Sequence, residues 1–175
     1  RFNEDLMWKE ITKLNHIFPN AKTSGYGEYS SSNIDAFQTN KILSDSVLFN
    51  YYLKAISLLE SFRNGELSTK DVFDIEKLSS YFAITDILGA QHGARWHNMR
   101  FYFNPITSKL EPIGFDGDTG NEITSLFSSI DNYLGRSDYV PFGAFHCMII
   151  KDKDFYYHYV KKMVLYSQKT YLDSI

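Results

Sequence analysis

Residues 93–120, GARWHNMRFYFNPITSKLEPIGFDGDTG, decide how this chain folds and where its polar side chains meet. Residues 99–103 are rich in aromatic, strand-favouring side chains, and Asn104 and Pro105 directly after them form a turn signal. Residues 109–115 then predict a returning strand, whose proline is tolerated only at a sheet edge or a bulge. The segment therefore predicts one β-hairpin.

Polar side chains flank this hairpin on both sides. Asn98 precedes the first strand, and Asp116 and Asp118 follow the second. Because a hairpin brings its two ends together, we expect Asn98 and Asp116 to lie within about one strand spacing of each other. Amide and carboxylate oxygens are hard ligands of the kind that bind Mg²⁺ together with phosphate groups. The same order, a loop ending in Asn, a hairpin and an Asp beside a Gly, occurs in the lower lobe of protein kinases.

The rest of the chain predicts mainly helices, because its apolar residues recur with the helical period. The second predicted helix has Ser44 or Asp45 as its cap, and Gly89 stands just beyond the third. The predicted helices cover residues 3–18, 45–63, 74–88, 121–133 and 152–175. Residues 20–40, rich in Gly, Ser and Asn, show no period and predict a mobile loop. The predicted fold class is therefore α+β, mostly α, with one hairpin.

The composition fits a single domain that covers residues 1–175. Aromatic residues make up 17% of the chain, which is too many for a disordered polypeptide. The net charge of -3 offers no basic surface, so we expect no nucleic-acid partner. No run of about 18 apolar residues occurs, so we expect no transmembrane segment in this chain. These properties leave the compartment open.

Residues 81–120, YFAITDILGAQHGARWHNMRFYFNPITSKLEPIGFDGDTG, resemble the core motif of the spore coat protein H (CotH) kinase family. That motif consists of an aromatic-rich helix, a loop ending in Asn, a strand, a turn with the returning strand, and a final acidic segment. Residues 1–11, RFNEDLMWKEI, and residues 149–172, IIKDKDFYYHYVKKMVLYSQKTYL, resemble its flanks. The resemblance extends over nearly the whole chain, but only over the later part of the family's domain.

This resemblance implies an atypical protein kinase with a kinase-like C-lobe, which uses ATP and Mg²⁺ or Mn²⁺ to phosphorylate Ser or Thr of a protein substrate. It implies that Asn98 and Asp116 bind the metal and the nucleotide, and that Asp116 takes part in catalysis. Asp118 is implied as a further metal ligand, and Arg95 and Arg100 as candidates to contact phosphate. The family also points to a location outside the cytoplasm, at the cell surface or in the spore coat.

One position departs from the kinase pattern. The catalytic Asp of that pattern lies five residues before the Asn, and counting back from Asn98 gives Gly93. The nearest titratable side chain is His92, which can accept a hydroxyl proton near neutral pH and is the first candidate for the catalytic base. Asp118 and Asp86 are the next candidates. Because phosphoryl transfer depends mainly on positioning and charge neutralisation, this departure weakens the kinase interpretation without excluding it.

Other interpretations stay open beside this one. No strand-rich segment with a phosphate-binding Lys precedes the first predicted helix, so we expect this chain alone to bind nucleotide weakly. The alternative function is a non-catalytic, kinase-like surface or scaffold protein that binds a protein partner. Residues 116–122, DGDTGNE, also suit a structural Ca²⁺ site or a plain turn, although they lack the spacing of an EF-hand loop.

Overall fold

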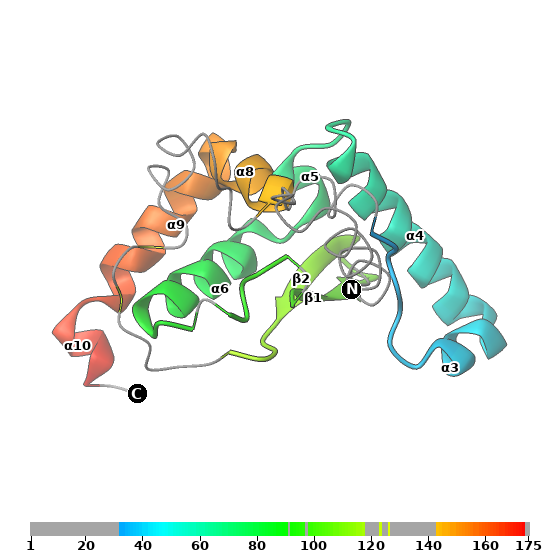
Figure 1. Ribbon diagram of the computed structural model, residues 1–175, viewed down its shortest axis with the longest axis horizontal. Coiled ribbons are helices and arrows are strands. Elements are labelled where there is room, and N and C mark those ends of the chain that lie inside the picture. Colours follow the sequence, from blue (N-terminus) through cyan, green and yellow to red (C-terminus); the bar gives the residue numbers. More distant parts are fainter. Residues whose placement is uncertain are drawn as a thin grey trace, which may run out of the picture.

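The computed structural model describes residues 32–90, 92–96, 98–117, 123, 126 and 143–173, except for the side chains of residues 143, 144, 147 and 172. This part of the chain is mostly helical with one antiparallel hairpin, which confirms the predicted class, α+β and mostly α (Figure 1). The elements are α3 (Thr39–Ser44), α4 (Ser46–Arg63), α5 (Thr69–Val72), α6 (Ile75–Ile87), β1 (Arg100–Asn104), β2 (Lys109–Ile113), α8 (Gly143–Lys151), α9 (Lys153–Tyr166) and α10 (Lys169–Leu172). None of the described helices is both long enough and apolar enough to cross a bilayer.

Two predicted helices fall on residues that are largely not described. The helix predicted at residues 3–18 lies entirely outside the described residues. Of the helix predicted at residues 121–133, only residues 123 and 126 are described, and neither is in a helix.

Helix α4 begins where its sequence predicts, after an aspartate cap. Oδ1 of Asp45 accepts hydrogen bonds from the backbone N–H groups of Val47 (2.9 Å) and Leu48 (3.1 Å). Ser44, the other predicted cap, is instead the last residue of α3. The sequence does not predict α3, because this short helix has no buried residue and therefore no apolar stripe.

The predicted loop at residues 20–40 is described only from Ser32 onward. Ser32 and Ile34 are buried, and both are held by α4 through their carbonyl groups. Arg63 donates from Nη1 to the Ser32 carbonyl (2.8 Å), and the Tyr52 hydroxyl donates to the Ile34 carbonyl (2.7 Å). The last two residues of the predicted loop form the first turn of α3. The described part of this segment therefore packs against α4.

Helices α6 and α9 lie side by side (Figure 1). Asp74 caps α6 by accepting a hydrogen bond from the backbone N–H of Lys77 (3.1 Å). Gly89, with a backbone φ of 62°, ends the helix, and the N–H of Ala90 then bonds to the Thr85 carbonyl (2.8 Å). Both predicted limits of this helix are confirmed.

The long helix predicted at residues 152–175 is divided in two in the structure. Helix α9 ends at Tyr166, and Gln168 has an extended backbone (φ -73°, ψ 134°) before the short α10 begins. The residues between Tyr166 and Tyr171 are all polar, so no apolar contact favours a continuous helix there. Ser167 also bonds through Oγ to the Val164 carbonyl (3.2 Å), which competes with helix propagation.

Phenylalanine side chains form the middle of the core. They come from five different segments and meet mainly edge to face, the geometry that aromatic rings favour. The rings of Phe62 and Phe73 are 5.1 Å apart at 89°, and those of Phe82 and Phe155 are 5.6 Å apart at 82°. All four side chains are 2% exposed or less. This aromatic cluster joins α4, α6 and α9 to the base of the hairpin.

The hairpin forms as predicted, with slightly shorter strands. The first strand begins one residue later than predicted, at Arg100, and the second ends two residues earlier, at Ile113, which is the partner of Arg100. Among the described residues the sheet has two strands, so Pro112 lies on an edge strand, where a proline is tolerated. An isolated parallel bridge joins Leu110 to Phe73, and the backbone N–H of Asp74 donates to the Leu110 carbonyl (3.0 Å). The hairpin is thereby fastened to the start of α6.

One carboxylate caps two helices at once. Oδ1 of Asp152 accepts from the N–H groups of Asp154 (2.9 Å) and Phe155 (3.1 Å) at the start of α9, and Oδ2 accepts from the N–H of Thr69 (3.2 Å) in α5. We expect Asp152→Ala to lower the free energy of unfolding by about 2 kcal/mol in urea denaturation, because both helix starts lose an acceptor. Asp152→Asn keeps one acceptor oxygen and should lose about half as much. Equal stability of Asp152→Ala and the wild type would contradict this role.

Candidate functional site

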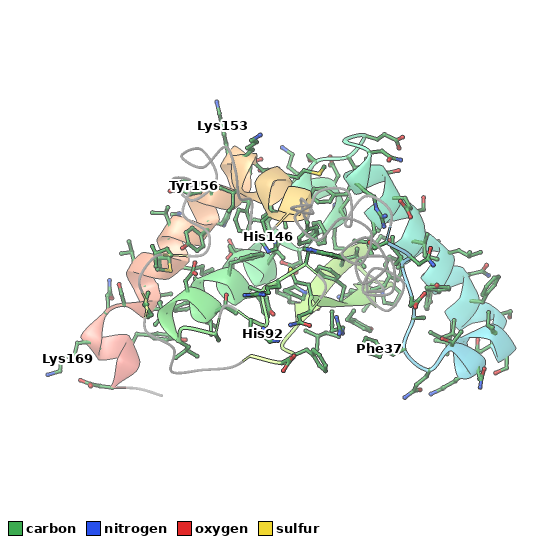
Figure 2. The ribbon with its side chains drawn as sticks, viewed as in Figure 1. Phe37, His92, His146, Lys153, Tyr156 and Lys169 are labelled. Carbon is green, nitrogen blue, oxygen red and sulfur yellow. The ribbon has the colours of Figure 1, made fainter. Side chains whose placement is uncertain are left out.

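Three predicted site residues meet where the hairpin ends. His92 lies in the loop after α6, Asn98 two residues before the start of β1, and Asp116 three residues after the end of β2. Nδ2 of Asn98 donates to the backbone carbonyl of His92 (3.0 Å), and Nε2 of His92 lies 3.2 Å from Oδ2 of Asp116. His92, labelled in Figure 2, therefore contacts both the residue before the hairpin and the residue after it.

These three side chains differ in their exposure to solvent. Asn98 is only 5% exposed, whereas the side chains of His92 and Asp116 are 44% and 53% exposed. The amide is thus a fixed internal group, and the imidazole and the carboxylate face solvent. A ligand could reach the latter two without displacing any core residue.

The contact with Asp116 favours one tautomer of His92. A carboxylate can only accept a hydrogen bond when ionised, so Nε2 of the imidazole is the nitrogen that donates to it. In the neutral ring, Nδ1 is then the basic nitrogen. The pair therefore presents a proton acceptor whose ring is oriented by the aspartate.

Asp116 itself has an unusual backbone conformation. Its φ of 50° lies in the left-handed region, which residues other than glycine adopt rarely. Aspartate tolerates this region better than most residues, at a cost of about 1 kcal/mol. The conformation turns the chain after β2 so that the carboxylate reaches His92.

Gly93 allows the loop and the segment after the hairpin to touch. We call residues 92–96 and 98 the site loop, and residues 114–117 the exit segment. A Cβ atom on Gly93 would lie 2.8 Å from the backbone oxygen of Phe115 and 3.3 Å from the backbone of Gly117. Because these neighbours are backbone atoms, only glycine fits at this position without moving the exit segment.

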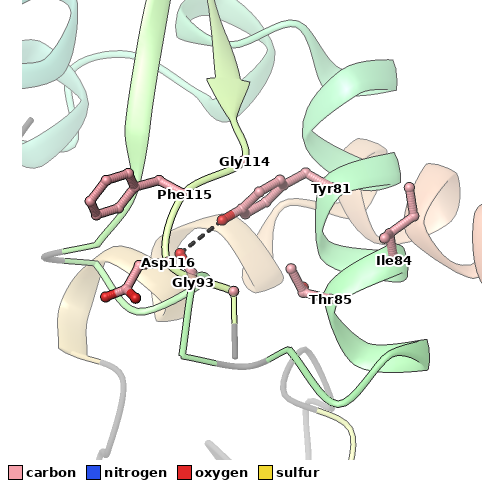
Figure 3. A pocket seen from close by; sticks show the side chains of 8 residues that line it. Tyr81, Ile84, Thr85, Gly93, Gly114, Phe115 and Asp116 are labelled. Atoms are coloured by element: carbon pink, nitrogen blue, oxygen red, sulfur yellow. Dashed lines mark hydrogen bonds between the residues drawn. The ribbon is translucent and has the colours of Figure 1, made fainter. Parts of the chain in front are cut away.

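Helix α6 completes one side of the site. The Tyr81 hydroxyl donates to the Gly93 carbonyl (2.8 Å; Figure 3), and burial raises the pKa of Tyr81 to about 12, so the hydroxyl keeps its proton. Tyr81, Ile84 and Thr85 form one wall of an open hollow of about 360 Å³, and Gly93 and the exit segment form the other. Asp116 is also among the residues that line this hollow (Figure 3).

The two arginines implied as phosphate contacts differ in position. Arg100 is 4% exposed, and its guanidinium lies over the rings of Phe115 (4.4 Å) and Phe37 (5.7 Å). It therefore helps to fix the exit segment through cation–π contacts. Arg95 is exposed, and its carbonyl accepts the N–H of Asn98 (2.8 Å) within the site loop.

Of the two remaining acidic candidates, the structure describes only Asp86, and it does not bring Asp86 to this group. Asp118 lies outside the described residues. Asp86 is fully buried, and its Oδ2 accepts a hydrogen bond from the Tyr159 hydroxyl (2.8 Å) between α6 and α9. Within the described ranges, no group of three or more His, Cys, Asp and Glu side chains is arranged to hold a metal ion. Of the three predicted metal ligands, Asn98 and Asp116 are the two that the structure describes.

No protein-family model, curated protein or solved structure matches this chain.

Proposed function

We propose that this chain is the C-lobe-like part of an atypical protein kinase of the spore coat protein H (CotH) family. Such an enzyme transfers phosphate from ATP to Ser or Thr of a protein substrate with Mg²⁺ or Mn²⁺, at the cell surface or in the spore coat. One observation supports the proposal most strongly: His92 contacts Asn98 through its carbonyl and Asp116 through its ring. Asn98 and Asp116, which the motif implies, are therefore connected through His92.

The oxygen donors of this group suit a divalent cation that is bound together with phosphates. Nδ2 of Asn98 is held by the site loop, and Oδ1 accepts no hydrogen bond from the described part of the chain. Asp116 uses Oδ2 for His92, and no described residue donates to its Oδ1. Mg²⁺ takes only one or two carboxylates from a protein and, when bound, neutralises charge on the phosphates. Asp118 is proposed as a further ligand.

His92 is proposed as the group that accepts the proton of the substrate hydroxyl. Its Nδ1 is the basic nitrogen, because Nε2–H is directed to Asp116. A base oriented by a third group is the usual arrangement for activating a hydroxyl. Gly93, at the position of the kinase Asp, has no room for a side chain, so we propose that the adjacent His92 supplies the base.

The absence of a carboxylate at Gly93 also favours the alternative function. A protein that has lost the loop carboxylate can keep the fold as a non-catalytic scaffold that binds a protein partner. The two functions differ in nucleotide binding. A ligand that binds only the native state raises its stability, so Mn²⁺-ATP should raise the melting temperature of the kinase but not that of the scaffold.

The decisive experiment is calorimetric titration of Mn²⁺-ATP into the full natural protein that carries this sequence. We expect saturable binding, and we expect Asp116→Ala to weaken it by more than about tenfold and Asn98→Ala by about tenfold, because each removes one oxygen donor. Asp173→Ala is the matched control, since this aspartate is exposed beyond α10. It should bind like the wild type.

Two results would count against the proposal. Absence of binding at millimolar Mn²⁺-ATP would favour the scaffold. Unchanged affinity in both Asp116→Ala and Asn98→Ala would place any nucleotide site elsewhere.

A further inference from the structure

Three consecutive backbone carbonyl groups of the site loop each accept a hydrogen bond from a side chain. The donors come from three different parts of the chain: α6, α8 and the end of the loop itself. They are the Tyr81 hydroxyl to the Gly93 carbonyl (2.8 Å), Nε2 of His146 to the Ala94 carbonyl (2.6 Å) and Nδ2 of Asn98 to the His92 carbonyl (3.0 Å). The loop is thus anchored from two helices that are not adjacent in sequence.

The donor from α8 is fixed within the core. His146 is fully buried, and its ring meets those of Phe82 (5.6 Å, 80°) and Phe145 (5.4 Å, 85°) edge to face. Because a carbonyl can only accept, Nε2 of His146 carries the proton that it donates to Ala94. The aromatic rings prevent the imidazole from turning away, so the loop carbonyl has a donor in a fixed place.

The donor from α6 is equally constrained. The ring of Tyr81 packs edge to face against that of Phe82 (5.9 Å, 90°), and its hydroxyl reaches the Gly93 carbonyl across the hollow beside the exit segment. The buried ring of Phe82 therefore supports both anchors, Tyr81 and His146.

These anchors flank the candidate site. Gly93 and Ala94 follow His92 directly, so holding their carbonyls limits rotation of the backbone that carries the imidazole. Asn98 lies four residues after Ala94 and bonds back to His92. A shift of the loop by about 1 Å would lengthen both the amide contact and the contact with Asp116, and errors of that size cost about 100-fold in catalytic sites.

We propose that Tyr81 and His146 are positioning residues that hold the site loop so that His92 and Asn98 face the exit segment. This role deepens the proposed function and rests on it for the ligand that the site takes. Its structural part, the immobilisation of the loop, can be tested without any ligand.

The test uses three variants of the full natural protein that carries this sequence: Tyr81→Phe, His146→Leu and His146→Gln. Tyr81→Phe removes one hydroxyl and keeps the ring. His146→Gln keeps an N–H donor at about the distance of Nε2, whereas His146→Leu removes it. Hydrogen exchange is measured at the amides of Asn98 and Met99, which bond to the Arg95 carbonyl (2.8 and 3.0 Å), with the amides of α9 as internal reference. Mn²⁺-ATP affinity is measured on the same samples.

We expect exchange at the two loop amides to become roughly tenfold faster in Tyr81→Phe and in His146→Leu, with unchanged exchange in α9. His146→Gln should exchange like the wild type, and this rescue separates a donor at the loop from general loss of packing. Nucleotide affinity should fall by roughly tenfold in the same two variants.

Wild-type exchange at the loop amides in both Tyr81→Phe and His146→Leu would overturn the inference. The inference would also fail if the variants exchanged faster in the loop but bound nucleotide as tightly as the wild type, because the anchors would then not position the ligand groups. If the wild type itself binds no nucleotide, the proposed function fails, and the exchange data alone decide whether Tyr81 and His146 hold the loop.

Discussion

Gly93→Asp, which restores the carboxylate of the kinase pattern, should lower the free energy of unfolding by roughly 3–5 kcal/mol. The Cβ atom alone would stand 2.8 Å from the Phe115 oxygen, so the exit segment would have to move. Gly93 is also buried, so the added carboxylate would lose water and face a backbone carbonyl of the same polarity. The substitution should therefore separate His92 from Asp116 rather than improve the site.

Urea denaturation followed by circular dichroism measures this loss. Gly93→Ala isolates the steric part and should lose about 1–3 kcal/mol. Gly114→Asp is the matched control, because no atom lies within 4 Å of a Cβ built at Gly114. This control should be nearly as stable as the wild type. If Gly93→Asp were also as stable as the wild type, the close approach of the loop and the exit segment would not exist in solution.

Phe82→Ala should lower the free energy of unfolding by about 3–5 kcal/mol, the range typical of deleting a buried phenylalanine. Phe82 is fully buried and meets the rings of Tyr81, His146 and Phe155 at 5.6–5.9 Å. A cavity at this point removes contacts from α6, α8 and α9 together. It also removes the support of both loop anchors, so the site should loosen before the whole domain unfolds.

Thermal and urea unfolding measure the loss of stability, and hydrogen exchange in the site loop measures the local effect. Ile106→Ala provides a control of the opposite kind, because Ile106 is 93% exposed in the hairpin turn and its truncation should change stability by less than about 0.5 kcal/mol. A loss of under about 1 kcal/mol in Phe82→Ala would mean that the ring is not part of a tightly packed core.

The elements that the sequence predicts well carry strong local signals. Helix α6 has a capping Asp74 and a terminal Gly89, and α4 has Asp45, so their limits follow from neighbouring residues. The hairpin follows from aromatic strands around an Asn-Pro turn. In all three cases the information lies within a few residues of the element that it determines.

The elements that the sequence misses depend on other parts of the chain. Helix α5 is one turn long, has no room for a periodic pattern, and its first N–H is satisfied by Asp152, distant in sequence. The break after Tyr166 leaves the helical stripe on both sides intact, so the pattern alone suggests one helix. Helix α3 buries nothing and has no pattern to detect.

The site divides in the same way. The sequence predicts that the segments before and after the hairpin lie together, because a hairpin must return to its start. The contacts of His92 with Asp116 and of Asn98 with the His92 carbonyl are seen only in the structure. The contributions of Tyr81 and His146 are not predictable either, since a Tyr or a His within an apolar stripe is usually a core residue. The use of Gly93 for close approach also escapes the sequence, because the atom that it avoids belongs to Phe115, 22 residues later.

The antiparallel register of the hairpin determines where residues can be inserted or deleted without disturbing the site. Arg100 pairs with Ile113 and Asn104 with Lys109, so the turn at residues 105–108 lies at the end of the hairpin remote from Asn98 and Asp116. Residues added to that turn leave the pairing intact. One residue deleted from a single strand, in contrast, shifts one end of the site by about 3.4 Å and reverses the face of the strand residues between the deletion and that end. The separation of the two oxygen donors can therefore change only in whole-residue steps, and insertions can accumulate at the turn while the opposite end stays constant.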